Sequence, residues 1–475
     1  MPGRLWKNSE YHMARGRSLA LSQFRRASIA WSHLTRVQLF CTASLVHAAS
    51  RSAASRSAAV QRAATCYVGV SGGVDSSVTA LLLQQQGHRV VGVHMRNWDE
   101  SDEVGDAVCP HTAELKVARK VCEQLGIPLL EVDFVQDYWN DVFERFVAGH
   151  QRGTTPNPDV LCNSEIKFKR FVDFALADGA DFVATGHYAR VQRRESGAPL
   201  QLFSGCDIDK DQSYFLAGID RAVLERIKFP LGAMQKRAVR ALATAHGLCT
   251  ATQRDSQGIC FIGKRQLSEF LPQYVAMRPG RFVALGNDDA APVGASDARE
   301  VVAQKHRGIG MYTIGQRAAI GGSAQPWYVV DKSVEANEIV VAKGKNHPAL
   351  YRTSLDVERA EFNWLCADAE AAVVRGEALR CSYRVRYRQS LGTCTVAALP
   401  EAGTAARLRI EFDQPQRAVT PGQTVALWDE HGGQCLGGGS ILPGEPLLRE
   451  QSERDASGAL TRTRSTATTR SSAVR

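Results

Sequence analysis

A chain of 475 residues is long enough for two or three domains. Its 44% hydrophobic and 23% charged residues are typical of a soluble globular protein, and no apolar run is long enough to span a bilayer. The net charge of +9 lies in residues 1–62, which hold ten basic residues and one acidic residue. The rest of the chain is neutral overall and needs local patches to bind nucleic acid.

The two ends of the chain differ in composition from its body. Residues 1–62 are rich in Arg, Ser and Ala, and residues 18–49 mix apolar side chains with arginines as an amphipathic helix does. This composition predicts an organelle transit peptide, for a mitochondrion in preference to a chloroplast; a basic RNA-binding arm is the alternative. Residues 446–475 hold Ser, Thr and Arg with few apolar residues, and we expect them to be disordered.

A glycine- and serine-rich stretch follows the first apolar run, residues 66–70. It reads Gly69-Val70-Ser71-Gly72-Gly73-Val74-Asp75-Ser76-Ser77, and a helical pattern continues through residues 78–86. A strand, a tight turn and a helix N-terminus in this order predict a phosphate site of backbone N–H groups, with Asp75 available for Mg²⁺. The stretch is not a Walker A loop. A serine- and glycine-rich turn that only caps a helix is the alternative.

Strand and helix patterns alternate through residues 63–263. We expect strands at residues 89–95, 129–134 and 181–185, and helices at 112–125, 139–147 and 164–176. Such alternation predicts an α/β domain with a doubly wound parallel sheet. Ligands of these sheets bind at the carboxyl ends of the strands, so the glycine-rich stretch, Met95 and Gly186 are expected to converge on one nucleotide.

The pattern changes to β after residue 263. Residues 264–346 predict a small β-rich module, and residues 347–445 predict a small barrel with strands at 379–387, 393–399, 408–412 and 424–428. Arg384, Arg386 and Arg388 recur at every second position, so a strand would place them on one face. This face is either a phosphate-binding stripe or an ordinary solvated surface.

Twelve cysteines occur without a CxxC pair, which argues against a disulfide framework and a standard zinc site. Two of them have neighbours suited to chemistry. Asn157 and Pro158 predict a helix start that places Asp159 and Cys162 one turn apart, where a proton carrier and a thiolate are favoured. A capped helix with a buried cysteine explains the same residues. Cys260 lies between two glycines, and its apolar neighbours alone favour an inert thiol.

The order of motifs resembles that of the tRNA-specific 2-thiouridylases, and residues 69–77 resemble the SGGxDS loop of PP-loop ATP pyrophosphatases. The resemblance spans residues 65–445. It is carried by residues 69–77, 97–98, 155–162, 185–188, 210–215, 258–263, 315–317, 326–330, 387–389, 420–423 and 435–439.

The resemblance implies an enzyme that uses ATP and Mg²⁺ to adenylate the C2 position of wobble uridine 34 in Lys, Glu and Gln tRNAs and replaces the oxygen by sulfur. The sulfur would come from a persulfide donor such as a cysteine desulfurase or a relay protein. Cys260 would carry the persulfide, Cys162 would form a transient disulfide with it, and Asp159 would act as acid and base.

The resemblance also implies binding residues. ATP would contact Gly69, Val70, Ser71, Gly72, Gly73, Val74, Asp75, Ser76, Met95 and Gly186. The target base would contact Asn157, Pro158 and Asp159. The tRNA would contact His187, Lys210, Asp211, Gln212, Arg386, Tyr387 and Gln423. Local sequence alone interprets His187 as a loop histidine and residues 210–212 as a polar turn.

Two other classes of protein remain open on the sequence. A PP-loop ligase of a small metabolite needs the glycine-rich loop but not the pair of cysteines. A non-catalytic RNA-binding protein needs neither Asp159 nor the thiols. An iron–sulfur cluster on Cys109, Cys162 and Cys260 is conceivable, although no ligand spacing supports it.

Overall fold

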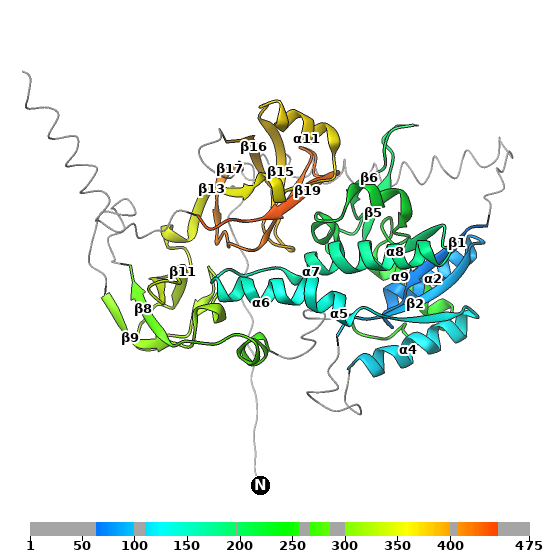
Figure 1. Cartoon of the computed structure of the whole chain (residues 1–475), viewed down its shortest axis with the longest axis horizontal. Helices are drawn as coiled ribbons and strands as arrows, with labels where there is room; N and C mark the ends of the chain where they lie inside the picture. The colour runs from blue at the N-terminus through cyan, green and yellow to red at the C-terminus, as the bar shows by residue number, and fades with distance from the viewer. Residues whose placement is uncertain are drawn as a thin grey trace, which may run out of the picture. The chain divides into compact units, whose positions relative to one another are not determined.

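The computed structural model describes residues 63–98, 110–195, 197–255, 266–285, 300–399 and 406–444. They form three large sheets in chain order and one two-stranded hairpin (Figure 1). The expectations for the transit peptide, Cys109, Cys260 and the tail after residue 445 lie outside these residues. Within the described ranges, no helix combines the length and the apolar character that crossing a membrane requires.

The first sheet is parallel throughout, with strand order β3-β2-β1-β4-β7. Its strands are β1 (Thr65–Gly69), β2 (Arg89–Arg96), β3 (Leu129–Asp133), β4 (Phe182–Ala184) and β7 (Ile227–Lys228). Its helices are α2 (Val74–Gln85), α4 (Pro110–Leu125), α5 (Val135–Tyr138), η1 (Trp139–Phe143), α6 (Glu144–Gln151), α7 (Pro158–Leu161), η2 (Cys162–Arg170), α8 (Phe171–Ala177) and α9 (Lys236–Ala245). Shorter elements are β5 (Ala189–Gln192), β6 (Gln201–Ser204), η3 (Ser213–Leu216) and η4 (Arg221–Arg226).

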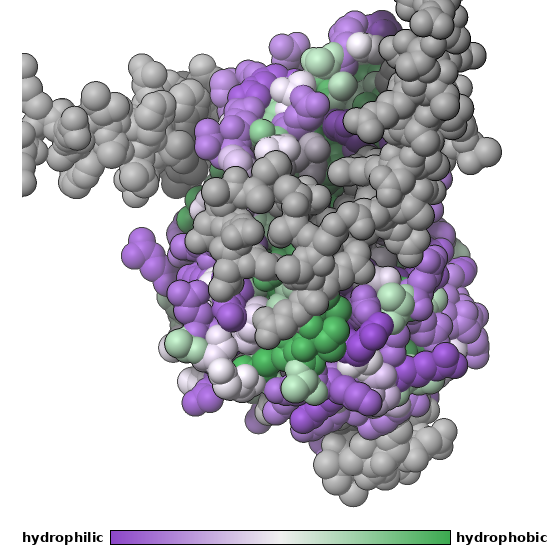
Figure 2. Space-filling view, turned by 90° about the vertical axis from the view of Figure 1, so that its left-hand side faces the viewer, coloured by the Kyte–Doolittle hydropathy of each residue, from purple (hydrophilic) through white to green (hydrophobic). Residues whose placement is uncertain are grey.

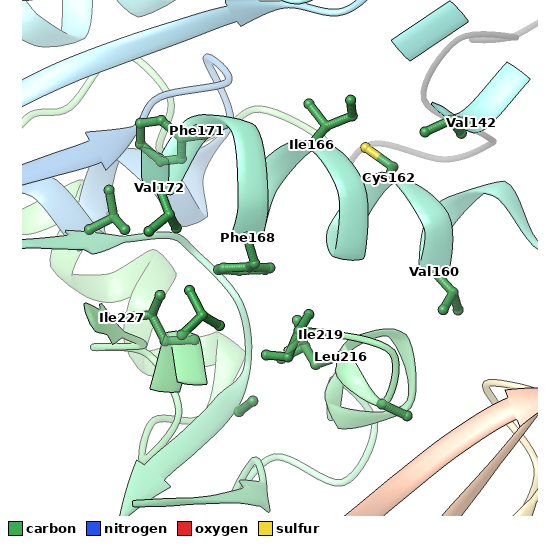
Figure 3. Packing of buried hydrophobic residues seen from close by; sticks show 14 of the residues in the cluster. Val142, Val160, Cys162, Ile166, Phe168, Phe171, Val172, Leu216, Ile219 and Ile227 are labelled. Atoms are coloured by element: carbon green, nitrogen blue, oxygen red, sulfur yellow. The ribbon is translucent and has the colours of Figure 1, made fainter. Parts of the chain in front are cut away.

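Both faces of this sheet are covered, which confirms the doubly wound prediction. Neighbouring side chains of a strand point to opposite faces. Val68 accordingly packs in one core with Leu83 of α2, whereas Tyr67 packs in another core with Phe171 of α8. Figure 3 shows part of the second core. Burial on both faces explains why β1 and β4 are nearly continuous apolar runs in the sequence.

The helix start predicted at Pro158 and the helix predicted at residues 164–176 belong to one bent helix. It begins at Pro158 and runs through α7, η2 and α8, and the middle part, η2, is wound as a π-helix. Phe168 interrupts the helical backbone with φ −110° and ψ 17°. Wide turns of this kind are common near functional sites.

The central sheet has the order β10-β11-β12-β8-β9, and the β-rich prediction for this part of the chain is confirmed. Its strands are β8 (Gly280–Ala284), β9 (Glu300–His306), β10 (Arg317–Ala318), β11 (Trp327–Ser333) and β12 (Glu338–Lys343). Short helical turns accompany it: α10 (Leu267–Phe270), η5 (Leu271–Gln273), η6 (Ile309–Met311) and η7 (Pro348–Leu350).

The third sheet has seven strands in the order β13-β17-β16-β15-β18-β19-β14. They are β13 (Tyr351–Glu358), β14 (Asn363–Trp364), β15 (Leu379–Arg384), β16 (Gly392–Ala398), β17 (Arg407–Arg417), β18 (Thr424–Trp428) and β19 (Cys435–Ser440), with η8 (Arg359–Glu361) and α11 (Ala367–Val374). A bridge between Val357 of β13 and Ile441, just beyond β19, brings the first strand against the end of β19. The sheet therefore curls as the predicted barrel requires.

The predicted arginine stripe is wrong. Strand β15 ends at Arg384, and the chain then turns, with the Gln389 N–H donating to the Arg386 carbonyl at 3.1 Å. Arg384 itself is buried and lies 3.1 Å from the Asp211 carboxylate. Arg384, Arg386 and Arg388 therefore share no strand face, because the alternation of side chains ends with the strand.

The surface is mostly hydrophilic on the face that Figure 2 presents, with hydrophobic residues gathered in one area. Among the described residues, six large hydrophobic side chains are exposed: Trp139, Ile208, Val301, Val334, Val374 and Leu391. Trp139, Val301 and Val374 lie in η1, β9 and α11, and the other three lie in connecting segments. Single exposed apolar residues of this kind are ordinary in folded proteins.

The buried Arg384–Asp211 pair makes a prediction about stability. The Arg384→Leu variant leaves the Asp211 carboxylate buried without its cation and should lower the free energy of unfolding by about 3–5 kcal/mol, measured by urea denaturation. The Arg380→Leu variant on the same strand is the control, because the Arg380–Asp413 pair is exposed to water. Equal free energies of unfolding for the two variants would contradict the prediction that the Arg384–Asp211 pair is costly to break.

Candidate active site

The glycine-rich stretch forms the turn between β1 and α2. Gly72 has φ +78°, and a Cβ atom there would lie 2.8 Å from the carbonyl oxygen of Glu114. Gly73 is the N-cap of α2, and its carbonyl accepts the Ser76 and Ser77 hydroxyls at 3.0 Å and 2.8 Å. The turn is thus held by its own serines and can present backbone N–H groups to an anion. We call residues 69–77 the phosphate loop.

Two other predicted residues meet the phosphate loop. A Cβ atom on Gly69 would lie 3.3 Å from the Met95 Cε atom at the end of β2. A Cβ atom on Gly186 would lie 2.9 Å from the backbone of both Asp75 and Ser76. The structure therefore brings residues from three strand ends to one place. Gly186 in particular lies where a side chain has no room.

The Asp75 carboxylate is paired with a residue that the sequence did not reveal. Lys236, the first residue of α9, donates to both Asp75 carboxylate oxygens at 2.7 Å. The Tyr188 hydroxyl donates to Asp75 Oδ1 at 2.8 Å. Burial raises the pKa of Tyr188, and the Asp75 charge raises it further, so the hydroxyl keeps its proton. Lys236 lies 161 residues from Asp75 and shows no motif of its own.

Lys236 also contacts a second carboxylate, that of Asp255, at 3.0 Å. Asp255 binds Lys210 at 2.7 Å and Arg240 at 2.5 Å as well. Burial opposes the charge on Asp255, but hydrogen bonds from Lys210 and Lys236 lower its pKa to about 2. Lys210, a predicted tRNA contact, is therefore engaged within the chain.

The helix start at Asn157 is confirmed. Asn157 Oδ1 accepts the Asp159 N–H at 3.2 Å, and Pro158 is the first helical residue. Asn163 Nδ2 donates to the Asp159 carbonyl at 2.9 Å. Cys162 is 1% exposed and packs in the core beside Ile166, as Figure 3 shows. Cys260 lies outside the described residues, so the cysteine pair stays a prediction.

Two predicted tRNA contacts, His187 and Asp211, are buried, and a third, Gln212, is partly exposed. His187 has its Nδ1 atom 2.7 Å from the Thr185 hydroxyl, and burial holds its pKa well below the usual value, so the ring is neutral at pH 7. Gln212 accepts the Tyr188 N–H at 3.0 Å. Asp211 is 3% exposed and paired with Arg384. These three residues make hydrogen bonds or ion pairs within the chain, and their contact with RNA stays a prediction.

Of the other predicted tRNA contacts, Gln423 and Tyr387 join the part of the chain with the third sheet to the part with the first, whereas Arg386 bonds within the former. Gln423 donates to the Thr155 carbonyl at 2.7 Å. The ring of Tyr387 lies 4.4 Å from that of Phe215, centroid to centroid. Arg386 donates to the Arg417 carbonyl at 2.9 Å. The structure thus places the third sheet against the segment that contains the predicted base-binding residues.

Protein metal sites are not evident in the part of the chain that the structure describes, since no group of three His, Cys, Asp or Glu residues gathers there. The nine cysteines described include one close pair, Cys381 and Cys394, with sulfur atoms 3.5 Å apart on neighbouring strands. Both are buried in the core of the third sheet, where they serve its packing.

Comparison with known proteins matches three family models to consecutive parts of the chain. They are a tRNA methyl transferase HUP domain at residues 64–264, a tRNA methyl transferase PRC-barrel domain at 268–343 and an aminomethyltransferase beta-barrel domain at 354–441. The tRNA-specific 2-thiouridylase MnmA of Methylococcus capsulatus is 46% identical over 79% of this chain and 95% of its own length. The protein of the same name from Sodalis glossinidius is 45% identical over 80% of this chain and 97% of its own.

The close approach of Gly186 predicts a loss of stability on substitution. The Gly186→Ala variant forces a methyl group against the Asp75 and Ser76 backbone and should lower the free energy of unfolding by about 1–3 kcal/mol. The control is Gly73→Ala, where φ is −87° and the nearest atom is Ser71 Oγ at 3.5 Å. Thermal unfolding checks both, and a Gly186→Ala variant as stable as the control would contradict the crowding.

Proposed function

The chain belongs to the tRNA-specific 2-thiouridylase family, and from this membership we propose that it is an ATP-dependent tRNA-uridine 2-sulfurtransferase. The observation that carries the proposal is 46% identity to a 2-thiouridylase over 95% of the relative's length. In the proposed reaction, AMP is transferred to the C2 oxygen of wobble uridine 34 and pyrophosphate leaves. A persulfide sulfur then displaces AMP. The activation makes a poor leaving group into a good one.

The phosphate loop, Met95 and Gly186 would bind ATP. The backbone N–H groups at the start of α2 suit a phosphate chain, and Gly72 and Gly186 allow the close backbone contacts that shape this turn. Mg²⁺ would offset the charge of the phosphates. Because Lys236 and Tyr188 already hold the Asp75 carboxylate, Mg²⁺ at Asp75 would have to displace the Lys236 ammonium.

Asn157, Pro158 and Asp159 would meet the target base, with Asp159 moving a proton. Cys260 would carry the persulfide, whose terminal sulfur attacks C2. The Cys162 thiolate would then attack the Cys260 sulfur, break the sulfur–sulfur bond and leave a Cys162–Cys260 disulfide, which a thiol reductant restores. Since Cys162 is 1% exposed, the side chains around it must move before it can react.

For the tRNA we propose contacts from His187, Lys210, Asp211, Gln212, Arg386, Tyr387 and Gln423. Several of these side chains are hydrogen-bonded within the chain, so binding would exchange internal bonds for bonds to RNA. The substrates would be Lys, Glu and Gln tRNAs. A cysteine desulfurase or a relay protein would supply the sulfur, and residues 1–62 would direct the chain to mitochondria.

The thiolation reaction tests the function. With tRNA, ATP, Mg²⁺ and a persulfide donor, the full chain should form 2-thiouridine at position 34, measured by mass analysis of digested tRNA. The Cys260→Ala and Cys162→Ala variants should lose thiolation by about 10²-fold or more, because each lacks a reacting sulfur, and should still bind ATP.

The matched control is Cys249→Ala, since Cys249 is partly exposed and takes no part in the proposed reaction. It should thiolate at the rate of the unmodified chain. Formation of AMP without thiolated tRNA would favour a ligase of a small metabolite. Absence of AMP in every combination would favour an RNA-binding protein without catalysis.

The location has its own test. A fluorescent protein preceded by residues 1–62 should enter mitochondria, and the full chain without residues 1–62 should not. Replacing the nine arginines of the segment by glutamine should block import, because transit peptides depend on positive charge. Import of the reporter into chloroplasts, or no import at all, would refute the mitochondrial proposal.

A further inference from the structure

Lys236 is a nearly buried cation at the phosphate loop. Its side chain is 12% exposed, and its ammonium group makes three contacts of 3.0 Å or less, two with Asp75 and one with Asp255 Oδ1. An ammonium group has three N–H donors. Each donor therefore has a partner in this arrangement.

Two features indicate that this lysine is more than a structural ion pair. Asp255 does not need it, because Lys210 and Arg240 already bind that carboxylate at 2.7 Å and 2.5 Å. Lys236 also opens α9, where the helix dipole disfavours a cation, and no acidic residue stands in that first turn. The Asp207 carboxylate fixes this unfavourable start by accepting the Lys236 N–H at 2.7 Å.

The contacts with Asp75 leave one donor that can be redirected. Lys236 bonds to both Asp75 oxygens, and the Tyr188 hydroxyl also donates to Oδ1. If the ammonium group gives up its bond to Oδ1, that oxygen keeps the Tyr188 hydroxyl and Oδ2 keeps Lys236. Releasing this donor thus leaves no buried acceptor without a partner.

We propose that Lys236 is a phosphate-binding residue of the nucleotide site, which Asp75 and Asp255 hold in place until a triphosphate enters. The backbone N–H groups of the phosphate loop supply directed hydrogen bonds, and Lys236 supplies the charge, as a compact cation with rotatable donors. The inference rests on the proposed use of ATP and adds a residue from outside the loop.

Calorimetric titration of the full chain with α,β-methylene-ATP and Mg²⁺ tests the inference. The Lys236→Met variant should bind this analogue at least about tenfold more weakly than the unmodified chain. The affinity of the same variant for AMP, which has one phosphate, should fall by less than about threefold. Arg240→Met is the matched control, because Arg240 lies one turn further along α9 and binds Asp255 at 2.5 Å; its affinity for the analogue should be unchanged.

An unchanged affinity of the Lys236→Met variant for the analogue overturns the inference. An equal loss of affinity for the analogue and for AMP also overturns it, because it indicates a structural role for Lys236. A measurement on the unmodified chain covers the case in which the variant does not fold. The analogue, but not AMP, should slow acetylation of Lys236 by acetic anhydride, followed by peptide mass; equal protection overturns the inference. If the unmodified chain binds the analogue but does not thiolate tRNA, the proposed function fails while the inference stands.

Discussion

The close approach of backbone to backbone at the end of β1 is the constraint on which the rest of the site depends. The turn leaves no room for a side chain at Gly72, and the neighbouring chain leaves none at Gly186. A Cβ atom on Gly72 would lie less than 3 Å from Glu114, and one on Gly186 would lie equally close to residues 75–76. The parallel sheet sets this geometry, because β1 and β4 are neighbours in it and end at the same edge. Residues that contact a nucleotide at this edge therefore lie at such strand ends or in the helices after them.

The joint between the first and third sheets is the second constraint. The buried Asp211–Arg384 pair ties the curled sheet to the segment before η3, and the Gln423–Thr155 hydrogen bond ties it to the segment before α7. A buried charge pair adds little stability overall but is costly to break, so it favours one arrangement of the two parts. An RNA bound by the third sheet would therefore be held close to Asn157 and Asp159.

Long-range electrostatics link the phosphate loop to the segment that leads to Cys260. Asp255 is the last described residue before that segment, and Lys236 joins it to Asp75. Two carboxylates and three cations thus form one cluster of ion pairs, which reaches the phosphate loop through Lys236 and Asp75. Their charges come from three regions of the chain, residues 75, 210 and 236–255, which only the folded sheet brings together.

The local elements of this protein can be predicted from its amino-acid sequence: the strand–loop–helix at residues 66–86, the parallel α/β alternation, the N-cap at Asn157 and the β-rich second half. These follow from hydrophobic period, glycine and capping residues, which act within a few positions of the chain. Three other features depend on tertiary packing: the burial of Arg384 against Asp211, the end of β15 before Arg386, and the contact of Lys236 with Asp75. A contact between residues about 160 positions apart produces no periodic pattern in the sequence, because it depends on how whole elements pack.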